Sequence, residues 1–118
     1  MFIESLKRIV DNVEGGIAGL VMGFDGIAVE SYTREGHKMD VNTVGMEFSF
    51  ILTQVRKAGE ILQIGDVNEI SIKAEKLTVV IRLLSHDYFL ALALAPEGNY
   101  GKGRYLMRVV APKLQQEL

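Results

Sequence analysis

The residues best suited to chemistry in this chain form a glycine-rich run, Gly98-Asn99-Tyr100-Gly101-Lys102-Gly103, between an expected strand and an expected helix. A phosphate-binding P-loop would need a glycine five residues before the glycine of the Gly-Lys pair, and a Ser or Thr directly after the lysine. Pro96 and Gly103 occupy those places, so the run fails both requirements. The dinucleotide-binding fingerprint is G-x-G-x-x-G and follows an early parallel strand. The glycines of this run have the reverse spacing, G-x-x-G-x-G, and lie near the end of the chain. We expect a glycine-permitted turn into a helix, with an anion held beside Lys102 and Arg104 as the weaker alternative.

Other reactive side chains lie apart from one another. His37 is expected in a polar loop and His86 in a hairpin turn, and neither has a metal-ligating partner at helical or strand spacing. Asp87 beside His86 is typical of a turn, and no serine has the sequence context of a nucleophile elbow. The chain contains no cysteine, which excludes thiol catalysis, disulfides and thiolate metal sites. The sequence therefore predicts no catalytic residue, no cofactor and no metal, and a protein that is not an enzyme.

Composition narrows the class of protein further. The chain has 118 residues, 48% of them hydrophobic and 24% charged, which fits one globular domain spanning residues 1–118. Its net charge of −2 gives no basic footprint for nucleic acid. The longest apolar runs, Ile17–Phe24 and Phe89–Ala95, have the length of strands and are far too short to span a membrane. No secretory leader is recognisable at the start, so we expect a cytoplasmic protein.

The hydrophobic pattern predicts three helices and five strands. The helices are expected at Phe2–Val13, Val41–Leu62 and Lys102–Glu117, where apolar residues recur at helical spacing. Asp40 is a suitable N-cap and Gly65 a suitable stop for the long helix, and Pro112 is expected to disturb the last helix. The strands are expected at these ranges: Ile17–Phe24, Ile27–Thr33, Asn68–Ala74, Leu77–Leu84 and Tyr88–Ala95.

This order, α-β-β-α-β-β-β-α, predicts an α/β (α+β) fold with one five-stranded antiparallel sheet. The first and last strands are the most apolar and belong in the centre, and the short connections then give the strand order 2-1-5-4-3. The second and third strands lie at the edges. Because the central strands are apolar on both sides, helices must cover both faces of the sheet.

The long helix carries more apolar residues than one buried face requires. At about 100° per residue, one sector faces the sheet and contains Val41, Val44, Phe48, Ile51, Leu52, Val55 and Leu62. Met46, Phe50 and Ile61 fall on the opposite side, with Gln54 and Lys57 near them. We interpret this second stripe as a surface that pairs with another protein. The alternative is a few singly exposed apolar side chains, which are common on any surface.

The expected edge strand, Asn68–Ala74, is a second candidate for pairing. An unpaired strand edge is a template for another strand unless charged residues block it. Glu69, Ser71 and Lys73 alternate here with Ile70 and Ile72. The charges favour a blocked edge and the free backbone favours pairing, so both interpretations stay open. If the strand pairs with its own copy, the interface contains Asn68, Glu69, Ile70, Ser71, Ile72 and Lys73, and two long helices would lie over one extended sheet.

Two stretches of the chain resemble the roadblock / dynein light chain family, and in particular its bacterial MglB-like members. The segment Asn99–Leu106 is similar to that family's Asn-x-Gly-x-x-Arg start of the last helix, and Gly19–Gly26 is similar to its first hairpin. The resemblance covers nearly the whole chain and implies the roadblock (profilin-like) fold. It also implies a homodimer joined through the third strand and the long helix.

The same resemblance implies a Ras-like small GTPase as partner, with the paired long helices as the surface that faces it. Met46, Phe50, Gln54, Lys57 and Ile61 are then the candidate contact residues. Such a protein would stimulate GTP hydrolysis or nucleotide cycling by positioning the partner's switch loops or by supplying a cation. Arg56 and Lys57 are the only cations well inside the helix, and repositioning is the favoured mechanism. A purely structural scaffold of the same family is the alternative, followed by a ligand-sensing α/β domain.

Overall fold

The computed structural model describes residues 2–118 and contains the predicted order of helices and strands. The elements are α1 (Phe2–Asp11), β1 (Gly16–Gly23), β2 (Ala28–Thr33), α2 (Val41–Leu62), β3 (Glu69–Lys73), β4 (Thr78–Leu83), β5 (Tyr88–Leu94) and α3 (Tyr100–Glu117). The bounds of α2 agree with the prediction at both ends. The predicted ends of the other elements agree with the structure or differ from it by one or two residues.

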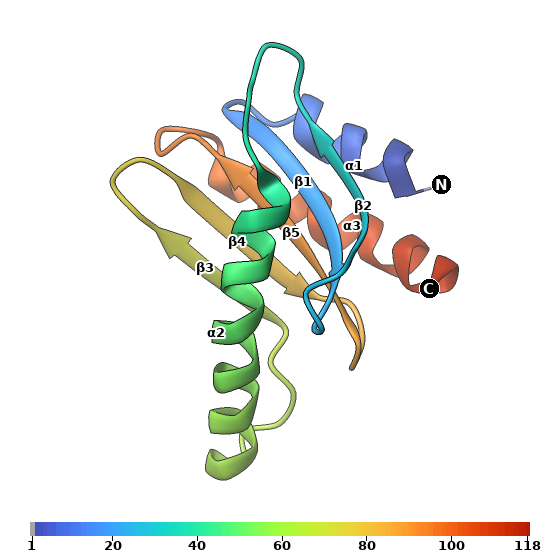
Figure 1. Cartoon of the computed structure of the whole chain (residues 1–118), viewed down its shortest axis with the longest axis vertical. Coiled ribbons are helices and arrows are strands. Elements are labelled where there is room, and N and C mark those ends of the chain that lie inside the picture. The colour runs from blue at the N-terminus through green and yellow to red at the C-terminus, as the bar shows by residue number, and fades with distance from the viewer. Residues whose placement is uncertain (1) are drawn as a thin grey trace.

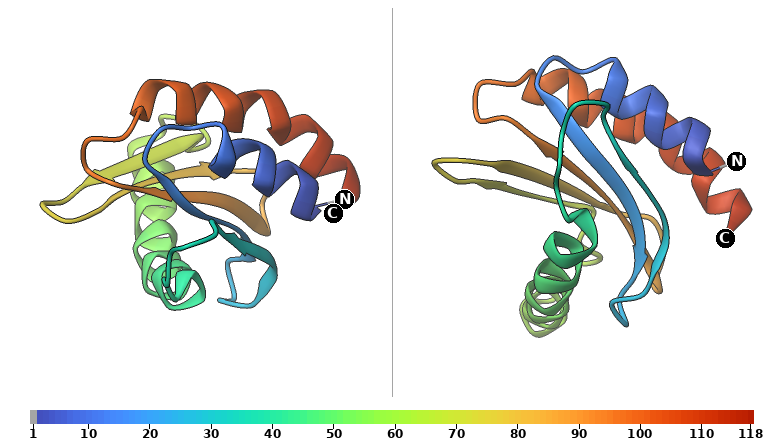
Figure 2. Two further views of the ribbon diagram at one scale, coloured as in Figure 1. Left: turned by 90° about the horizontal axis from the view of Figure 1, so that it is seen from above. Right: turned by 45° about the horizontal axis from the view of Figure 1, so that its top comes forward.

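The five strands form one antiparallel sheet in the order β2-β1-β5-β4-β3 (Figure 1), which confirms the predicted topology. The central strands β1 and β5 are buried along almost their whole length. Helices cover these strands on both faces of the sheet. Figure 2 shows α1 and α3 side by side on one face and α2 alone on the other. The molecule therefore has three layers, with helices on both faces as expected.

The sheet separates the interior into two cores. The first lies under α1 and α3 and includes Leu6, Leu90 and Met107. The second lies under α2 and includes Leu20, Leu52 and Phe89. Because side chains alternate along each strand, neighbouring residues of β5 supply opposite cores. In α3, Val109 is exposed although the neighbouring Val110 is buried.

Asp40 caps the start of α2 as predicted, whereas the end of that helix is formed by Gln63 and not by Gly65. The side chain of Asp40 accepts hydrogen bonds from both the hydroxyl and the backbone N–H of Thr43, and these bonds lower the pKa of its carboxyl group. At the other end, α2 stops before Gly65 because Gln63 adopts the left-handed conformation (φ 56°). Asn99 caps α3 through a hydrogen bond from the N–H of Lys102. The helix continues past Pro112 to Glu117.

The first hairpin contains Asp25-Gly26, a dipeptide typical of two-residue turns, but its loop is one residue longer. Gly23 donates to Ile27 across a three-residue loop, and Gly26 takes the left-handed conformation (φ 86°) within it. This arrangement matches a type I turn followed by a left-handed residue, the usual three-residue hairpin. The glycine has the expected role, one position later in the turn.

Two glycines inside α2 lie in different surroundings. A Cβ atom on Gly45 would collide with Cδ2 of Leu20 and lie 3.0 Å from Sδ of Met22, so this turn of the helix approaches β1 too closely for a side chain. A Cβ atom on Gly59 would meet only ordinary contacts at 3.4 Å, from the loop that follows the helix. Close approach to the sheet thus explains Gly45 but not Gly59.

We therefore expect opposite effects from the same substitution at these two glycines. Gly45→Ala should lower the free energy of unfolding, because overpacking a core costs about 1–3 kcal/mol and exceeds the gain in helix propensity. Gly59→Ala should raise the free energy of unfolding by up to about 1 kcal/mol, because alanine favours the helix and nothing must move. Urea unfolding followed by circular dichroism measures both. Equal effects at the two positions would contradict the packing described for α2.

Candidate functional site

Helix α2 is longer than the sheet it covers. Its 22 residues span about 33 Å at 1.5 Å per residue, whereas the strands have five to eight residues each. Figure 1 shows the first half of the helix lying across the sheet and the second half projecting beyond it. The buried residues cluster accordingly at Val41, Gly45, Ser49 and Leu52, and only Gly59 is buried in the second half.

The predicted partner-facing stripe lies on the side of α2 that points away from the sheet. Phe50 is 66% exposed, Ile61 is 73% exposed, and Met46 is exposed as well. Gln54 and Lys57 are also exposed and lie between them along the helix. The structure thus brings the five predicted side chains together on one face.

Our assignment of Ile51 and Leu62 to the buried sector of α2 is wrong. Ile51 is 48% exposed and Leu62 is 66% exposed. Leu62 is the last residue of the projecting half of α2, whereas Ile51 precedes the buried Leu52 and lies about 100° round the helix from it, at the flank of the buried sector. Ile64, in the loop after the helix, is exposed too and was not predicted. A comparison of helix length with strand length would have indicated the overhang from the sequence. The apolar surface of α2 is therefore wider than one stripe.

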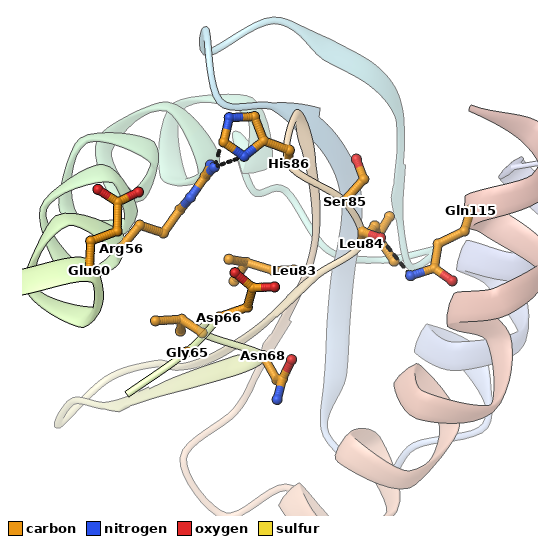
Figure 3. A pocket seen from close by; sticks show the side chains of 11 residues that line it. Arg56, Glu60, Gly65, Asp66, Asn68, Leu83, Leu84, Ser85, His86 and Gln115 are labelled. Carbon is orange, nitrogen blue, oxygen red and sulfur yellow. Dashed lines mark hydrogen bonds between the residues drawn. The ribbon is translucent and has the colours of Figure 1, made fainter. Parts of the chain in front are cut away.

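One cation holds the projecting half of α2 against the rest of the molecule. The guanidinium of Arg56 lies 4.1 Å from the ring centroid of Phe24 and 2.7 Å from Nδ1 of His86, in the turn between β4 and β5. Phe24 in turn packs against Phe89, with ring centroids 5.3 Å apart. Figure 3 shows Arg56 reaching from the helix toward His86. Arg56 is thus engaged within the fold, which leaves Lys57 as the more available cation of the pair.

A surface hollow of about 280 Å³ lies below this contact, between the end of α2, the loop that follows it and the β4–β5 turn (Figure 3). Its lining is largely polar and exposed and includes Glu60, Asp66, Asn68 and His86. Every buried side-chain nitrogen or oxygen of residues 2–118 has a hydrogen-bond partner, so no polar group of the interior awaits a ligand. This arrangement gives no support to the ligand-sensing alternative.

Within residues 2–118, no group of three or more acidic or histidine side chains is placed to hold a metal ion. None of the helices in that range is long and apolar enough to cross a membrane. The glycine-rich run from Gly98 to Gly103 forms the turn and cap before α3 and the first residues of that helix.

The edge strand β3 is fastened to the start of α3 by its outward-pointing side chains. Glu69 receives two close contacts from Arg104, at 2.6 and 2.7 Å, and this carboxylate raises the pKa of the guanidinium. The hydroxyl of Ser71 lies 2.6 Å from that of Tyr100, and the ammonium of Lys73 lies 4.2 Å from the centroid of the Tyr100 ring. The predicted pairing residues Glu69, Ser71 and Lys73 therefore face α3.

The other two side chains of the strand, Ile70 and Ile72, face the α2 side and are half-buried there. Asn68 is exposed and precedes the strand. On the side of β4, Asn68 accepts a hydrogen bond from Leu83, and Ala74 donates one to Leu77. Because backbone groups alternate in direction along a strand, those of Glu69, Ser71 and Lys73 point to the free edge. An apolar helix face and an unpaired strand edge thus occur in the same molecule.

No protein-family model matches the chain, and no curated protein matches it. Several solved structures do. MglC from Myxococcus xanthus is 47% identical, with 99% of this chain and 98% of that one covered and a TM-score of 0.73. The gliding protein MglB from Thermus thermophilus is 12% identical over 97% of this chain and 85% of that one, with a TM-score of 0.86.

A Roadblock/LC7 domain from Streptomyces avermitilis is 16% identical over 94% of this chain and 95% of that one, with a TM-score of 0.76. The MglB and Roadblock/LC7 structures share the fold, whereas MglC shares nearly half of the residues as well. The motif from Asn99 to Arg104 has the capping and strand-fastening contacts described above. The chain is therefore a member of the roadblock / dynein light chain (Roadblock/LC7) family.

Proposed function

We propose that this protein acts as a homodimeric adaptor whose paired α2 helices dock and regulate a Ras-like small GTPase. The observation that carries the proposal is the exposed apolar surface of α2, which no other element in residues 2–118 covers. Large exposed apolar patches on soluble domains are typical of protein-binding sites. The GTPase as partner comes from the family resemblance, and regulation would act on its switch loops.

The proposed dimer has one favoured strand register. If β3 pairs antiparallel with the β3 of a second copy and Ser71 lies on the two-fold axis, Glu69 is opposite Lys73 of the second copy and Ile70 is opposite its Ile72. Opposite charges and matched aliphatic side chains both stabilise cross-strand pairs. This register uses all five strand residues, and the outward backbone groups of Glu69, Ser71 and Lys73 form its hydrogen bonds.

Cysteine cross-linking tests the dimer and its register, since the natural chain contains no cysteine. Ser71→Cys should form an intermolecular disulfide under mild oxidation, because directly opposed residues of a hydrogen-bonded pair have Cα atoms about 5.5 Å apart. Lys73→Cys is the matched control, because in this register its two copies lie beyond disulfide reach. Non-reducing gel electrophoresis reports the result.

Light scattering of the unmodified protein at micromolar concentration provides the independent measurement. A monomeric mass would contradict the dimer itself. A dimeric mass with cross-linking at Lys73→Cys and none at Ser71→Cys would contradict only the register.

Phe50→Asp tests the α2 surface. Because Phe50 is exposed, the variant should keep the unfolding midpoint of the natural chain, while dimer or partner binding weakens by about 2 kcal/mol or more, roughly thirtyfold. Val29→Asp, an equivalent change at an exposed position of β2, is the control and should leave that binding intact. Sedimentation equilibrium and calorimetric titration measure the two associations. An unfolded Phe50→Asp variant would mean that the side chain belongs to the core.

A scaffold without effect on GTP hydrolysis is the second candidate, and one observation favours it. Arg56 is already held by Phe24 and His86, so it is not free to stabilise a transition state in a partner. The scaffold would use the same surface and dimer but leave the partner's nucleotide cycle unchanged.

GTP turnover of a Ras-like GTPase that binds the protein separates the two candidates. We expect the rate of hydrolysis or of nucleotide exchange to change several-fold when the adaptor saturates the GTPase, and Phe50→Asp to remove that change. Single-turnover hydrolysis and release of a fluorescent nucleotide measure the two rates. Binding with both rates unaltered would leave only the scaffold.

A further inference from the structure

A second surface lies on the opposite face of the sheet from α2. A groove of about 450 Å³ runs between the start of β3, the end of β4 and the outer side of α3. Its lining includes Glu69, Arg82, Arg104, Tyr105 and Arg108. The groove thus contains three guanidinium groups and one carboxylate, although the whole chain has a net charge of −2.

One carboxylate does not balance three guanidinium groups, so the groove has an excess of positive charge. Arg104 makes a close pair with Glu69 at 2.6 Å, whereas Arg82 stands 4.0 Å from the same carboxylate, at the outer limit of an ion pair. Arg108 lies over the ring of Tyr105, 5.9 Å from its centroid. Helix α3 continues this bias, since it contains four basic residues and one acidic residue. Clefts lined by one sign of charge concentrate ligands of the other sign.

The side chains of the groove are better suited to the carboxylates of a peptide than to a small anion such as phosphate. A phosphate site needs donors that converge on one point, often from backbone N–H groups. Here Arg104 is already paired with Glu69 and fastens β3, so only the guanidiniums of Arg82 and Arg108 remain for a ligand. The exposed ring of Tyr105 and the exposed side chain of Val109 add apolar surface on the same helix. Guanidinium groups bind carboxylates in a planar, two-pronged geometry.

We propose that this groove is a second docking surface, for an acidic segment of a partner protein whose carboxylates pair with Arg82 and Arg108 and whose apolar side chains contact Tyr105. The surface lies on the face opposite α2, and Glu69 at its rim also belongs to the proposed dimer strand. Because Arg82 and Arg108 come from the same protomer and lie outside β3, carboxylate binding by this pair requires neither the GTPase nor the dimer.

Fluorescence anisotropy with a short labelled peptide of alternating glutamate and leucine tests the proposal on the full chain. We expect the peptide to bind, and binding to weaken as ionic strength rises from low to physiological values. Arg108→Glu and Arg82→Gln should each weaken binding roughly fivefold or more. Lys38→Glu, the same charge change in an exposed loop outside the groove, should have little effect.

Three results would overturn the proposal. The first is that Lys38→Glu weakens peptide binding as much as Arg108→Glu does, which would mean that binding depends only on the net charge of the protein. The second is equal binding of a peptide with glutamine in place of glutamate. The third is full competition by inorganic phosphate at matched ionic strength, which would indicate an anion site. Unchanged thermal unfolding of the Arg108→Glu variant, whose side chain is exposed, ensures that lost binding does not reflect lost folding.

Discussion

The burial of β1 and β5 on both faces is the constraint on which the rest of the structure depends. Two adjacent strands made almost entirely of apolar residues cannot border water on either side, so each face of the sheet must be covered. Helices α1 and α3 together cover one face, and α2 covers the other alone. Because one helix is narrower than the sheet, the apolar side chains of the edge strand β3 on that face are covered less completely, and Ile70 and Ile72 remain half-buried. The helix is also longer than the sheet, so its second half projects beyond this layer (Figure 1).

The edge strand β3 combines unpaired backbone groups with side chains that are held in place. Three side chains of β3 face α3, where Glu69 and Arg104 form an ion pair and Ser71 contacts Tyr100. These contacts fix the direction of the strand while its outer backbone groups stay unpaired. Charged residues at a sheet edge usually oppose pairing with unrelated strands. In the proposed dimer, the same charges would favour a strand with the complementary pattern and disfavour others.

Much of the fold was predictable from the sequence, because the apolar content of the strands and the short connections between them leave few topologies. The residues of the α2 stripe were predictable for the same reason, since the helical period separates Phe50 from Leu52 without any knowledge of the sheet. The errors at Ile51 and Leu62 have a physical cause. Helical periodicity tells which residues share a side, but it does not tell where the opposing surface ends. The contact of Arg56 with Phe24 and His86 joins three distant segments, and no local pattern in the sequence signals it.

The alternation of side chains along β3 gives the two faces of the domain different physical sensitivities. Ile70 and Ile72 point to the face of α2, and Glu69 and Lys73 point to the face of α3. Apolar association weakens on cooling and responds little to salt, whereas association between charged groups weakens as ionic strength rises. In the proposed complexes, temperature would therefore act mainly on contacts at the face of α2, and ionic strength mainly on contacts at the face of α3. The five residues of β3 lie on the boundary between these two proposed surfaces and contribute side chains to both.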